Sequence, residues 1–291
     1  MHETVTLTMA MVAAAFKGPQ AVLSHCPFLA IVLSTQGHPP ESESEKTPMI
    51  DSQVDIATKD GKTTTFITHP ERGGPFPVVI FYMDAPAIRE ELRDMARRLG
   101  TAGYYVMLPN MYYRAGVMEI GPINPDPESP ERKRMFSLMS SLTIPLVMED
   151  TKALLAYAET QKAANTKIIG TVGYCMSGRY AVNAATHFSD RVKAAASVYG
   201  VQLATDHPDS PHLAANKTKA ELYFACAETD VYAPQEVIDK VSAGMKGTKN
   251  EVEIYPGTHH GFAFPKRPVY DRDAAERHWE RLLALYKRNL V

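Results

Sequence analysis

The sequence contains few cysteines. Only three occur among its 291 residues, and their spacing fits neither a disulfide framework nor a zinc finger: they are Cys26, Cys175 and Cys226. We therefore expect reduced thiols and a cytoplasmic protein. The histidines outside the motifs discussed below lack the spacing of metal ligands, so we expect neither a metal nor another cofactor.

Long runs of one charge and long apolar runs are absent as well. The formal net charge is −2, and without a basic patch nothing attracts the protein to nucleic acid or to acidic lipid. The longest apolar run, residues 21–34, is interrupted by His25, Cys26 and Pro27 and is shorter than the roughly 20 residues that span a bilayer. We expect a small-molecule partner, no membrane contact, and a monomer or weak homodimer.

Residues 1–48 have a composition of their own. An apolar opening is followed by residues 37–48, which are rich in Pro, Ser and Glu, and this composition is typical of linkers or poorly ordered chain. A signal peptide would carry positive charge ahead of its apolar part, whereas the first charged residue here is Glu3. We expect an N-terminal extension ahead of Met49 rather than a secretion signal.

From residue 49 to the end, strand and helix patterns alternate. Asp60-Gly61 is a pair typical of a hairpin turn, and Pro77 to Tyr82 is an apolar run of the kind found in strands covered on both faces. Further strands are expected at 54–58, 63–68, 104–108, 166–172, 192–198, 221–226 and 252–255, and helices at 88–99, 145–161, 178–187, 234–245 and 271–290. This alternation predicts one α/β domain over residues 49–291, with a mostly parallel central sheet and helices on both faces.

One of these strands runs into Gly173-Tyr174-Cys175-Met176-Ser177-Gly178 and then into a helix. This is the context of a nucleophile elbow, in which a strained turn exposes the nucleophile between two small residues. Gly173 and Ser177 are small enough on either side of Cys175, although the second small residue is usually glycine. The hexapeptide alone also fits a buried structural cysteine in a strand-to-helix loop.

Two further residues stand in the order that a nucleophile elbow requires, with an acid after the nucleophile and a histidine after the acid. Asp230 follows the strand expected at 221–226, and His260 follows the strand expected at 252–255. Taken singly, the aspartate could cap a helix and the histidine could lie on the surface. Together with Cys175 they provide a thiolate, a base for its proton, and a carboxylate that sets the imidazole tautomer.

The elbow and the segment Tyr255-Pro256-Gly257-Thr258-His259-His260-Gly261-Phe262 resemble the dienelactone hydrolase family of the α/β-hydrolase superfamily. The likeness extends from about Met49 to the C-terminus. It implies an α/β-hydrolase fold and a carboxymethylenebutenolidase-like cleavage of an ester or lactone. It also implies that His260, rather than His259, is the catalytic histidine.

The resemblance implies an activating ion pair. Family members carry an acid after the third strand, usually Glu, and the matching residue here is Asp84; the matching arginine is Arg114. In the family the acid pairs with the arginine at rest, and a substrate carboxylate then takes the arginine and frees the acid to deprotonate the cysteine. A purely structural ion pair is the alternative.

Matching to the fold and the family also indicates groups that line the site. The backbone N–H groups of Ala85 and Met176 are the expected oxyanion donors. Phe264 stands where some members carry a second arginine, which suggests an apolar wall and a larger or less charged acyl group. Tyr112 and Tyr199 either line the pocket or pack in the core.

These residues favour one function over two others. We expect a cofactor-free hydrolase that cleaves a small carboxylic ester or lactone through a Cys175 acyl-enzyme. A catalytically weak scaffold that binds a small acidic ligand is an alternative, because fold does not determine function. Acyl transfer, amide cleavage and broad aryl-ester hydrolysis by the same thiol also remain open.

Overall fold

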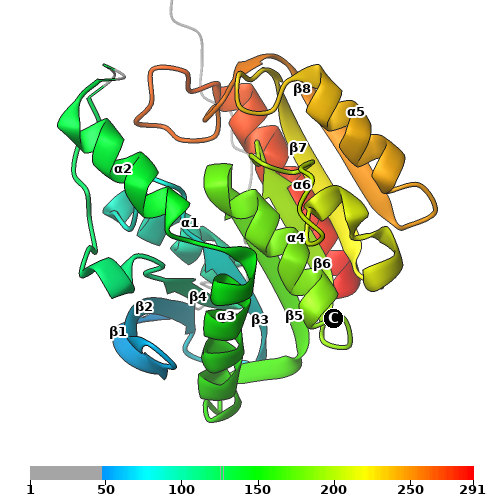
Figure 1. Cartoon of the computed structure of the whole chain (residues 1–291). Helices are drawn as coiled ribbons and strands as arrows, with labels where there is room; N and C mark the ends of the chain where they lie inside the picture. The colour runs from blue at the N-terminus through cyan, green and yellow to red at the C-terminus, as the bar shows by residue number, and fades with distance from the viewer. Residues whose placement is uncertain (1–47, 125, 127) are drawn as a thin grey trace, which may run out of the picture. The chain divides into compact units, whose positions relative to one another are not determined.

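The computed structural model describes residues 48–124, 126 and 128–291, so the extension expected at residues 1–48 lies outside the described residues except for Pro48. An eight-stranded sheet runs through the described region in the order β1-β2-β4-β3-β5-β6-β7-β8 (Figure 1). The strands are β1 (Met49–Thr58), β2 (Gly61–Pro70), β3 (Phe76–Tyr82), β4 (Tyr105–Pro109), β5 (Ala164–Tyr174), β6 (Val192–Val198), β7 (Glu221–Thr229) and β8 (Asn250–His259).

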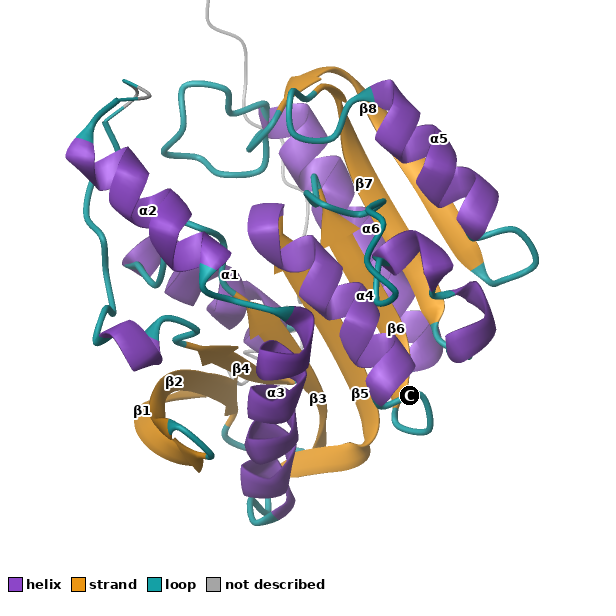
Figure 2. Cartoon of the chain, viewed as in Figure 1, coloured by secondary structure: helices purple, strands orange, loops and turns teal. Residues whose placement is uncertain are grey.

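Helices cover both faces of this sheet. In Figure 2, α3 and α4 lie in front of the strands, whereas α1 and α6 lie behind them. The helices are α1 (Glu90–Thr101), α2 (Pro130–Ser140), α3 (Ile144–Glu159), α4 (Gly178–His187), α5 (Gln235–Gly244) and α6 (Arg272–Asn289), with short 3-10 helices η1 (Tyr113–Ala115), η2 (Cys175–Ser177), η3 (Pro211–Leu213) and η4 (Ala215–Lys217). None of the helices in the described residues is long and apolar enough to cross a membrane.

The prediction of a mostly parallel sheet is confirmed. Only β1 with β2 and β2 with β4 pair antiparallel, and the strands from β4 to β8 are parallel. The hairpin turn lies one residue earlier than expected, at Lys59-Asp60, because Gly61 already pairs with Thr58 as the first residue of β2. Gly61 has a φ of 143°, which suits glycine.

Helix α2 is absent from the sequence-based prediction. Its start follows ordinary rules, since the Ser129 hydroxyl accepts a hydrogen bond from the backbone N–H of Arg132 at 3.4 Å and a proline opens the helix. However, only Met135 and Leu138 of this helix are buried. Two apolar contacts do not produce a recognisable amphipathic pattern.

The connections place the functional loops at one edge of the sheet. From β3 the chain first adds β4 on one side and later β5 on the other, so the strand order reverses between β3 and β5. In parallel sheets a crevice opens at such a reversal, outside the carboxyl ends of the strands. The loop that begins with Met83 and the turn at Cys175 follow these two strands directly.

Candidate active site

The turn after β5 has the geometry of a nucleophile elbow. Cys175 has a φ of 55°, a left-handed conformation that is strained for a residue other than glycine. Its carbonyl oxygen accepts a hydrogen bond from the backbone N–H of Val201 at 3.0 Å, which anchors the turn to the chain beyond β6. The expected strand, strained turn and helix are all present, and the side chain of Cys175 is partly exposed.

Close packing around the elbow explains its small residues. A Cβ atom on Gly173 would collide with the carbonyl oxygen of Ser177, and one on Gly178 would collide with the hydroxyl of Ser197. Ser177 replaces the usual glycine without a clash. Its buried hydroxyl accepts a hydrogen bond from the backbone N–H of Tyr174 at 2.9 Å and lies 2.9 Å from the carbonyl oxygen of Tyr82, to which it can donate.

The acid and the histidine predicted from sequence meet in space. Nδ1 of His260 lies 2.7 Å from Oδ2 of Asp230, and the other oxygen of that buried carboxylate accepts the backbone N–H of Tyr232 at 2.8 Å. With one proton held on Nδ1, Nε2 of His260 is the atom that can give up or take a second proton. Nε2 is buried and meets the geometry of a hydrogen bond with none of the described residues, although the Cys175 sulfur is near enough to interact with the ring electrostatically.

Electrostatics favour the charged form of His260. Burial lowers the pKa of this imidazole, but the Cys175 sulfur and the hydrogen-bonded Asp230 carboxylate outweigh burial and raise the pKa to about 9. Two aromatic rings flank the imidazole, with centroid distances of 5.1 Å to Tyr199 and 5.0 Å to Tyr232. The surroundings of His260 therefore stabilise an imidazolium next to the elbow.

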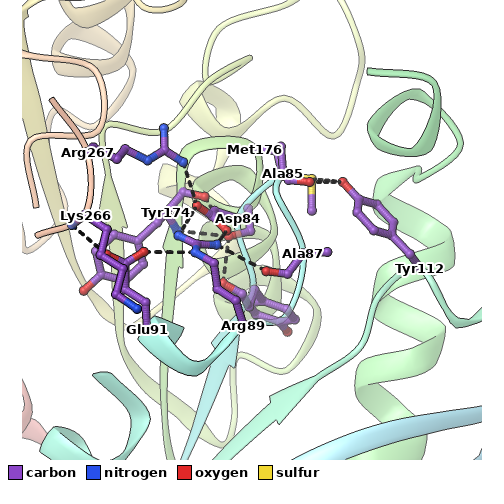
Figure 3. A network of polar contacts seen from close by, with 12 residues as sticks. Asp84, Ala85, Ala87, Arg89, Glu91, Tyr112, Tyr174, Met176, Lys266 and Arg267 are labelled. Atoms are coloured by element: carbon purple, nitrogen blue, oxygen red, sulfur yellow. Dashed lines mark hydrogen bonds and ion pairs between the residues drawn. The ribbon is translucent and has the colours of Figure 1, made fainter. Parts of the chain in front are cut away.

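The two expected oxyanion donors lie on neighbouring loops. In the described residues, no backbone hydrogen bond of a turn or loop uses the N–H of Ala85 or of Met176. The buried hydroxyl of Tyr112 connects the two residues, because it donates to the carbonyl oxygen of Ala85 at 3.0 Å and lies 3.2 Å from the sulfur of Met176 (Figure 3). Tyr112 therefore has a polar role at the site in addition to its burial.

Asp84 is fully buried and pairs with two arginines. Nη1 and Nη2 of Arg89 lie 2.6 Å and 3.1 Å from its two oxygens, and Nη2 of Arg267 lies 3.1 Å from Oδ2 (Figure 3). Nε of Arg89 also donates to Glu91 at 2.9 Å. The two positive charges of these arginines balance the two negative charges of Asp84 and Glu91.

The expected pairing of Asp84 with Arg114 is wrong. Both terminal nitrogens of Arg114 bind the carboxylate of Asp150 at 2.7 Å, and its Nε donates to Asp60 at 2.9 Å. The reason is the path of the chain after β4. There η1 packs beside the β1–β2 hairpin, where the hydroxyls of Tyr113 and Thr58 are 2.7 Å apart.

Phe264 lies behind the arginines of this cluster. Its ring is fully buried, and the guanidinium carbons of Arg89 and Arg267 lie 4.9 Å and 5.1 Å from its centroid. The wall at this position is therefore covered by cations, in contrast to the apolar surface expected from sequence. Cation and ring contacts of this kind stabilise guanidinium groups in a defined orientation.

Sequence reasoning missed Arg89 and Arg267. Arg89 is five residues after Asp84 in the same loop, and a search for a local cation could have found it. Arg267 is three residues beyond Phe264, which stands where some family members carry a second arginine. No local pattern indicates that its side chain returns to Asp84 across 183 residues of sequence.

Tyr199 packs against the imidazole of His260, but its hydroxyl group lacks a hydrogen bond to any described residue. The residue is fully buried, its hydroxyl has no hydrogen-bond partner in the described part of the chain, and its backbone φ is 36°. Burial raises the pKa of this phenol well above its ordinary value. The hydroxyl therefore remains protonated at any physiological pH.

Comparisons with known proteins identify the family of the chain. The model of the dienelactone hydrolase family matches residues 63–290. A protein of Methylorubrum extorquens that is provisionally named carboxymethylenebutenolidase is 28% identical over 241 residues, which cover 80% of this chain and 79% of that protein. A protein of Escherichia coli with the same provisional name is 26% identical over 219 residues, covering 74% of this chain and 78% of that protein.

Solved structures share the fold. A provisionally named dienelactone hydrolase from Klebsiella pneumoniae superposes with a TM-score of 0.74 at 22% identity, covering 83% of this chain and 99% of that chain. A dienelactone hydrolase from Anabaena variabilis gives a TM-score of 0.60 at 16% identity, covering 84% of this chain and 99% of that chain. The α/β-hydrolase fold is confirmed, and the family match spans most of the described region. The chain belongs to the dienelactone hydrolase family and is a hydrolase of carboxylic esters or lactones.

Proposed function

We propose that the protein cleaves a small ester or lactone through an acyl-enzyme on Cys175, with His260 and Asp230 as its partners. The observation that carries this proposal is the strained elbow, whose cysteine raises the pKa of an imidazole that an aspartate orients at 2.7 Å. A structural cysteine would need neither the strained backbone nor the oriented base.

The proposed reaction has two halves. The Cys175 thiolate attacks the carbonyl carbon, and the N–H groups of Ala85 and Met176 stabilise the oxyanion. As the intermediate collapses, the bond to the alcohol oxygen breaks and Nε2 of His260 donates its proton to that oxygen. Water then attacks the thioester while His260 takes a proton, which releases the carboxylic acid and restores the thiolate and imidazolium pair.

For a lactone, the alcohol oxygen remains attached to the acyl group, and hydrolysis opens the ring without a separate leaving molecule. The same atoms act in both halves. His260 is used twice, first as an acid and then as a base, so any change to its orientation affects acylation and deacylation together.

The cluster around Asp84 supports recognition of an acyl group that carries a carboxylate. Arg267 is partly exposed, and a substrate carboxylate could replace Asp84 as its partner while Arg89 keeps the aspartate in place. Because Arg89 still pairs with both oxygens of Asp84, we assign the aspartate to positioning the arginines and leave the proton of the cysteine to His260. Here Arg267 and Arg89 take the place that Arg114 was expected to occupy.

Activity and thiol chemistry together test the proposal. The purified chain is assayed with 4-nitrophenyl acetate and with a dienelactone, before and after iodoacetamide, and as the Cys175→Ser and Cys175→Ala variants. We expect alkylation of Cys175 and the alanine change to remove activity on both substrates. Cys226→Ser is the matched control, because burial raises the pKa of that thiol to about 12 and it should neither react nor matter. Full activity in Cys175→Ala would overturn the proposal.

A further inference from the structure

The sheet places two different surfaces on opposite sides of the nucleophile. The loop after β3 carries Asp84 and Arg89, and the loop after β7 carries Val231 and Tyr232. In the strand order, β5 with its elbow at Cys175 lies between β3 and β7. Paired charges therefore follow the strand on one side of the elbow, and apolar and aromatic residues follow a strand on its other side.

The mechanism decides which part of an ester lies on which side. His260 must give its proton to the alcohol oxygen, so the alcohol portion leaves beside this imidazole. Of the two rings that flank the imidazole, Tyr199 is fully buried, whereas Tyr232 is 41% exposed. The side of Tyr232 is therefore the more exposed of these two flanks.

Val231 and Tyr232 are consecutive residues, and both are exposed. Val231 is 83% exposed, although it directly follows the buried Asp230. Exposed apolar side chains next to the catalytic aspartate offer contact area to an apolar group of a substrate, because such a contact removes both surfaces from water.

Contacts at both ends hold the Tyr232 ring in place. Its backbone N–H donates to Oδ1 of Asp230 at 2.8 Å, and its hydroxyl accepts a hydrogen bond from Nη2 of Arg132 at 3.0 Å. Arg132 comes from α2, and its guanidinium carbon lies 5.6 Å from the ring centroid of Phe136. A ring with few remaining rotamers binds a partner at a smaller entropic cost.

From these contacts we propose that Val231 and Tyr232 form the subsite for the alcohol portion of the substrate, and that this subsite favours an aromatic or other apolar alcohol. The inference rests on the acyl-enzyme mechanism proposed above and names the leaving-group class that it accepts. The acyl portion then lies toward Arg89 and Arg267.

Kinetics can separate this role from an effect on His260. The alcohol is gone once the acyl-enzyme has formed, so a subsite for the alcohol affects acylation and leaves deacylation unchanged. We compare kcat/KM for benzyl acetate and ethyl acetate, whose leaving alkoxides have similar basicity, in the wild type and in Tyr232→Ala. Deacylation is measured from the steady state that follows the burst with 4-nitrophenyl acetate, which passes through the same acetyl-enzyme.

We expect Tyr232→Ala to lower the benzyl-to-ethyl ratio of kcat/KM by about tenfold, the scale on which an apolar pocket discriminates, with an unchanged deacylation rate. Tyr232→Phe, which keeps the ring, should retain most of the ratio. Val231→Ser, at a position that is 83% exposed and so buries no polar group in the core, should lower the ratio in the same direction. Ile50→Ala, at an exposed residue of edge strand β1, is the matched control and should leave the ratio unchanged.

Two results would overturn the inference while the proposed function stands. One is an unchanged ratio in both Tyr232→Ala and Val231→Ser. The other is an equal loss of acylation and deacylation in Tyr232→Ala, which would assign Tyr232 to positioning His260. Failure of the proposed function looks different, because the wild type would then show neither a burst nor any acetylation of Cys175.

Discussion

Nδ1 of His260 and Oδ2 of Asp230 lie 2.7 Å apart, although 30 residues and a whole helix separate them in sequence. Parallel strands β7 and β8 bring their carboxyl ends together, and each residue follows one of these strands directly. The adjacency therefore comes from the sheet, and the short contact comes from charge-assisted hydrogen bonding between the two side chains.

Replacement of this carboxylate should impair both halves of the reaction. In Asp230→Asn the amide can donate to Nδ1, which favours the tautomer whose proton is on Nε2 and removes the base. We expect kcat to fall by about 10³ to 10⁴-fold, with similar losses in burst rate and steady state. Asp239→Asn, which changes an exposed aspartate of α5 that accepts from Gln235, should have less than a twofold effect. A loss confined to one half of the reaction would contradict this account.

The nucleophile should control the titration of its partner. Cys175 and Asp230 raise the pKa of His260 to about 9 against the opposing effect of burial. In Cys175→Ala the burial remains and one of the two favourable partners is gone, so the pKa should fall. NMR titration of the imidazole signals measures this directly, with Cys226→Ala as the control. A pKa that stays near 9 in Cys175→Ala would show that the sulfur does not interact with the ring.

Local patterns predicted the parts of the site that depend on local geometry. The elbow was predictable because all its requirements fall within six consecutive residues. The tight turn needs small residues at Gly173 and Ser177, on either side of Cys175. Asp230 and His260 were predictable because each follows an apolar strand in an order that the fold imposes.

Long-range partners could not be predicted in the same way. Arg114 was assigned to Asp84 by matching positions, but Asp60 and Asp150 compete for the same guanidinium and bind it. The approach of Arg267 to Asp84 depends on the course of the whole loop after β8. Which arginine pairs with an acid depends on the distances between the charges in the folded chain. Spacing along the sequence does not give these distances.

Ser177 should stabilise the elbow through its hydroxyl. In Ser177→Ala the buried N–H of Tyr174 loses its acceptor, and an unsatisfied buried donor costs about 1 to 3 kcal/mol. We expect a lower free energy of unfolding in urea by that amount. Ser141→Ala is a suitable control, because that partly buried hydroxyl donates only to a helix-terminal carbonyl at 2.7 Å. Equal stability of Ser177→Ala and the wild type would show that the backbone holds the turn without this bond.

Acid should destabilise the protein through His278. Burial lowers the pKa of this imidazole to about 3, and its Nε2 lies 3.0 Å from the hydroxyl of Tyr174. The unfolded chain binds a proton near pH 6.5 while the folded chain does not, so stability falls as the pH drops from about 6.5 toward 3. At about 1.4 kcal/mol per pKa unit the loss reaches several kcal/mol.

Urea unfolding at several pH values tests this prediction. His278→Gln should be less stable than the wild type at pH 7 but should lose less stability between pH 6 and pH 4. His207→Gln, at an exposed histidine, should retain the wild-type slope. If His278→Gln and the wild type lose stability in parallel, another group is responsible for the acid sensitivity.

Arg267 should select for charge in the acyl group. It is the more exposed of the two partners of Asp84, with 28% of its side chain accessible compared with 24% for Arg89, and its loss leaves the aspartate paired with Arg89. We expect Arg267→Gln to lower kcat/KM for the monophenyl ester of glutaric acid by about tenfold or more, since hydrogen bonds to charged groups contribute about 1.5 to 3 kcal/mol. Phenyl butyrate, which lacks the carboxylate, should change by less than about threefold. Arg281→Gln removes the same charge at a distant position beside Glu253 and should affect neither ester. A general loss of positive charge would lower kcat/KM for the anionic ester in both variants, so only a selective loss in Arg267→Gln supports direct contact. An equal loss of kcat/KM on both esters in Arg267→Gln would instead assign this arginine to holding the loop that carries Asp84.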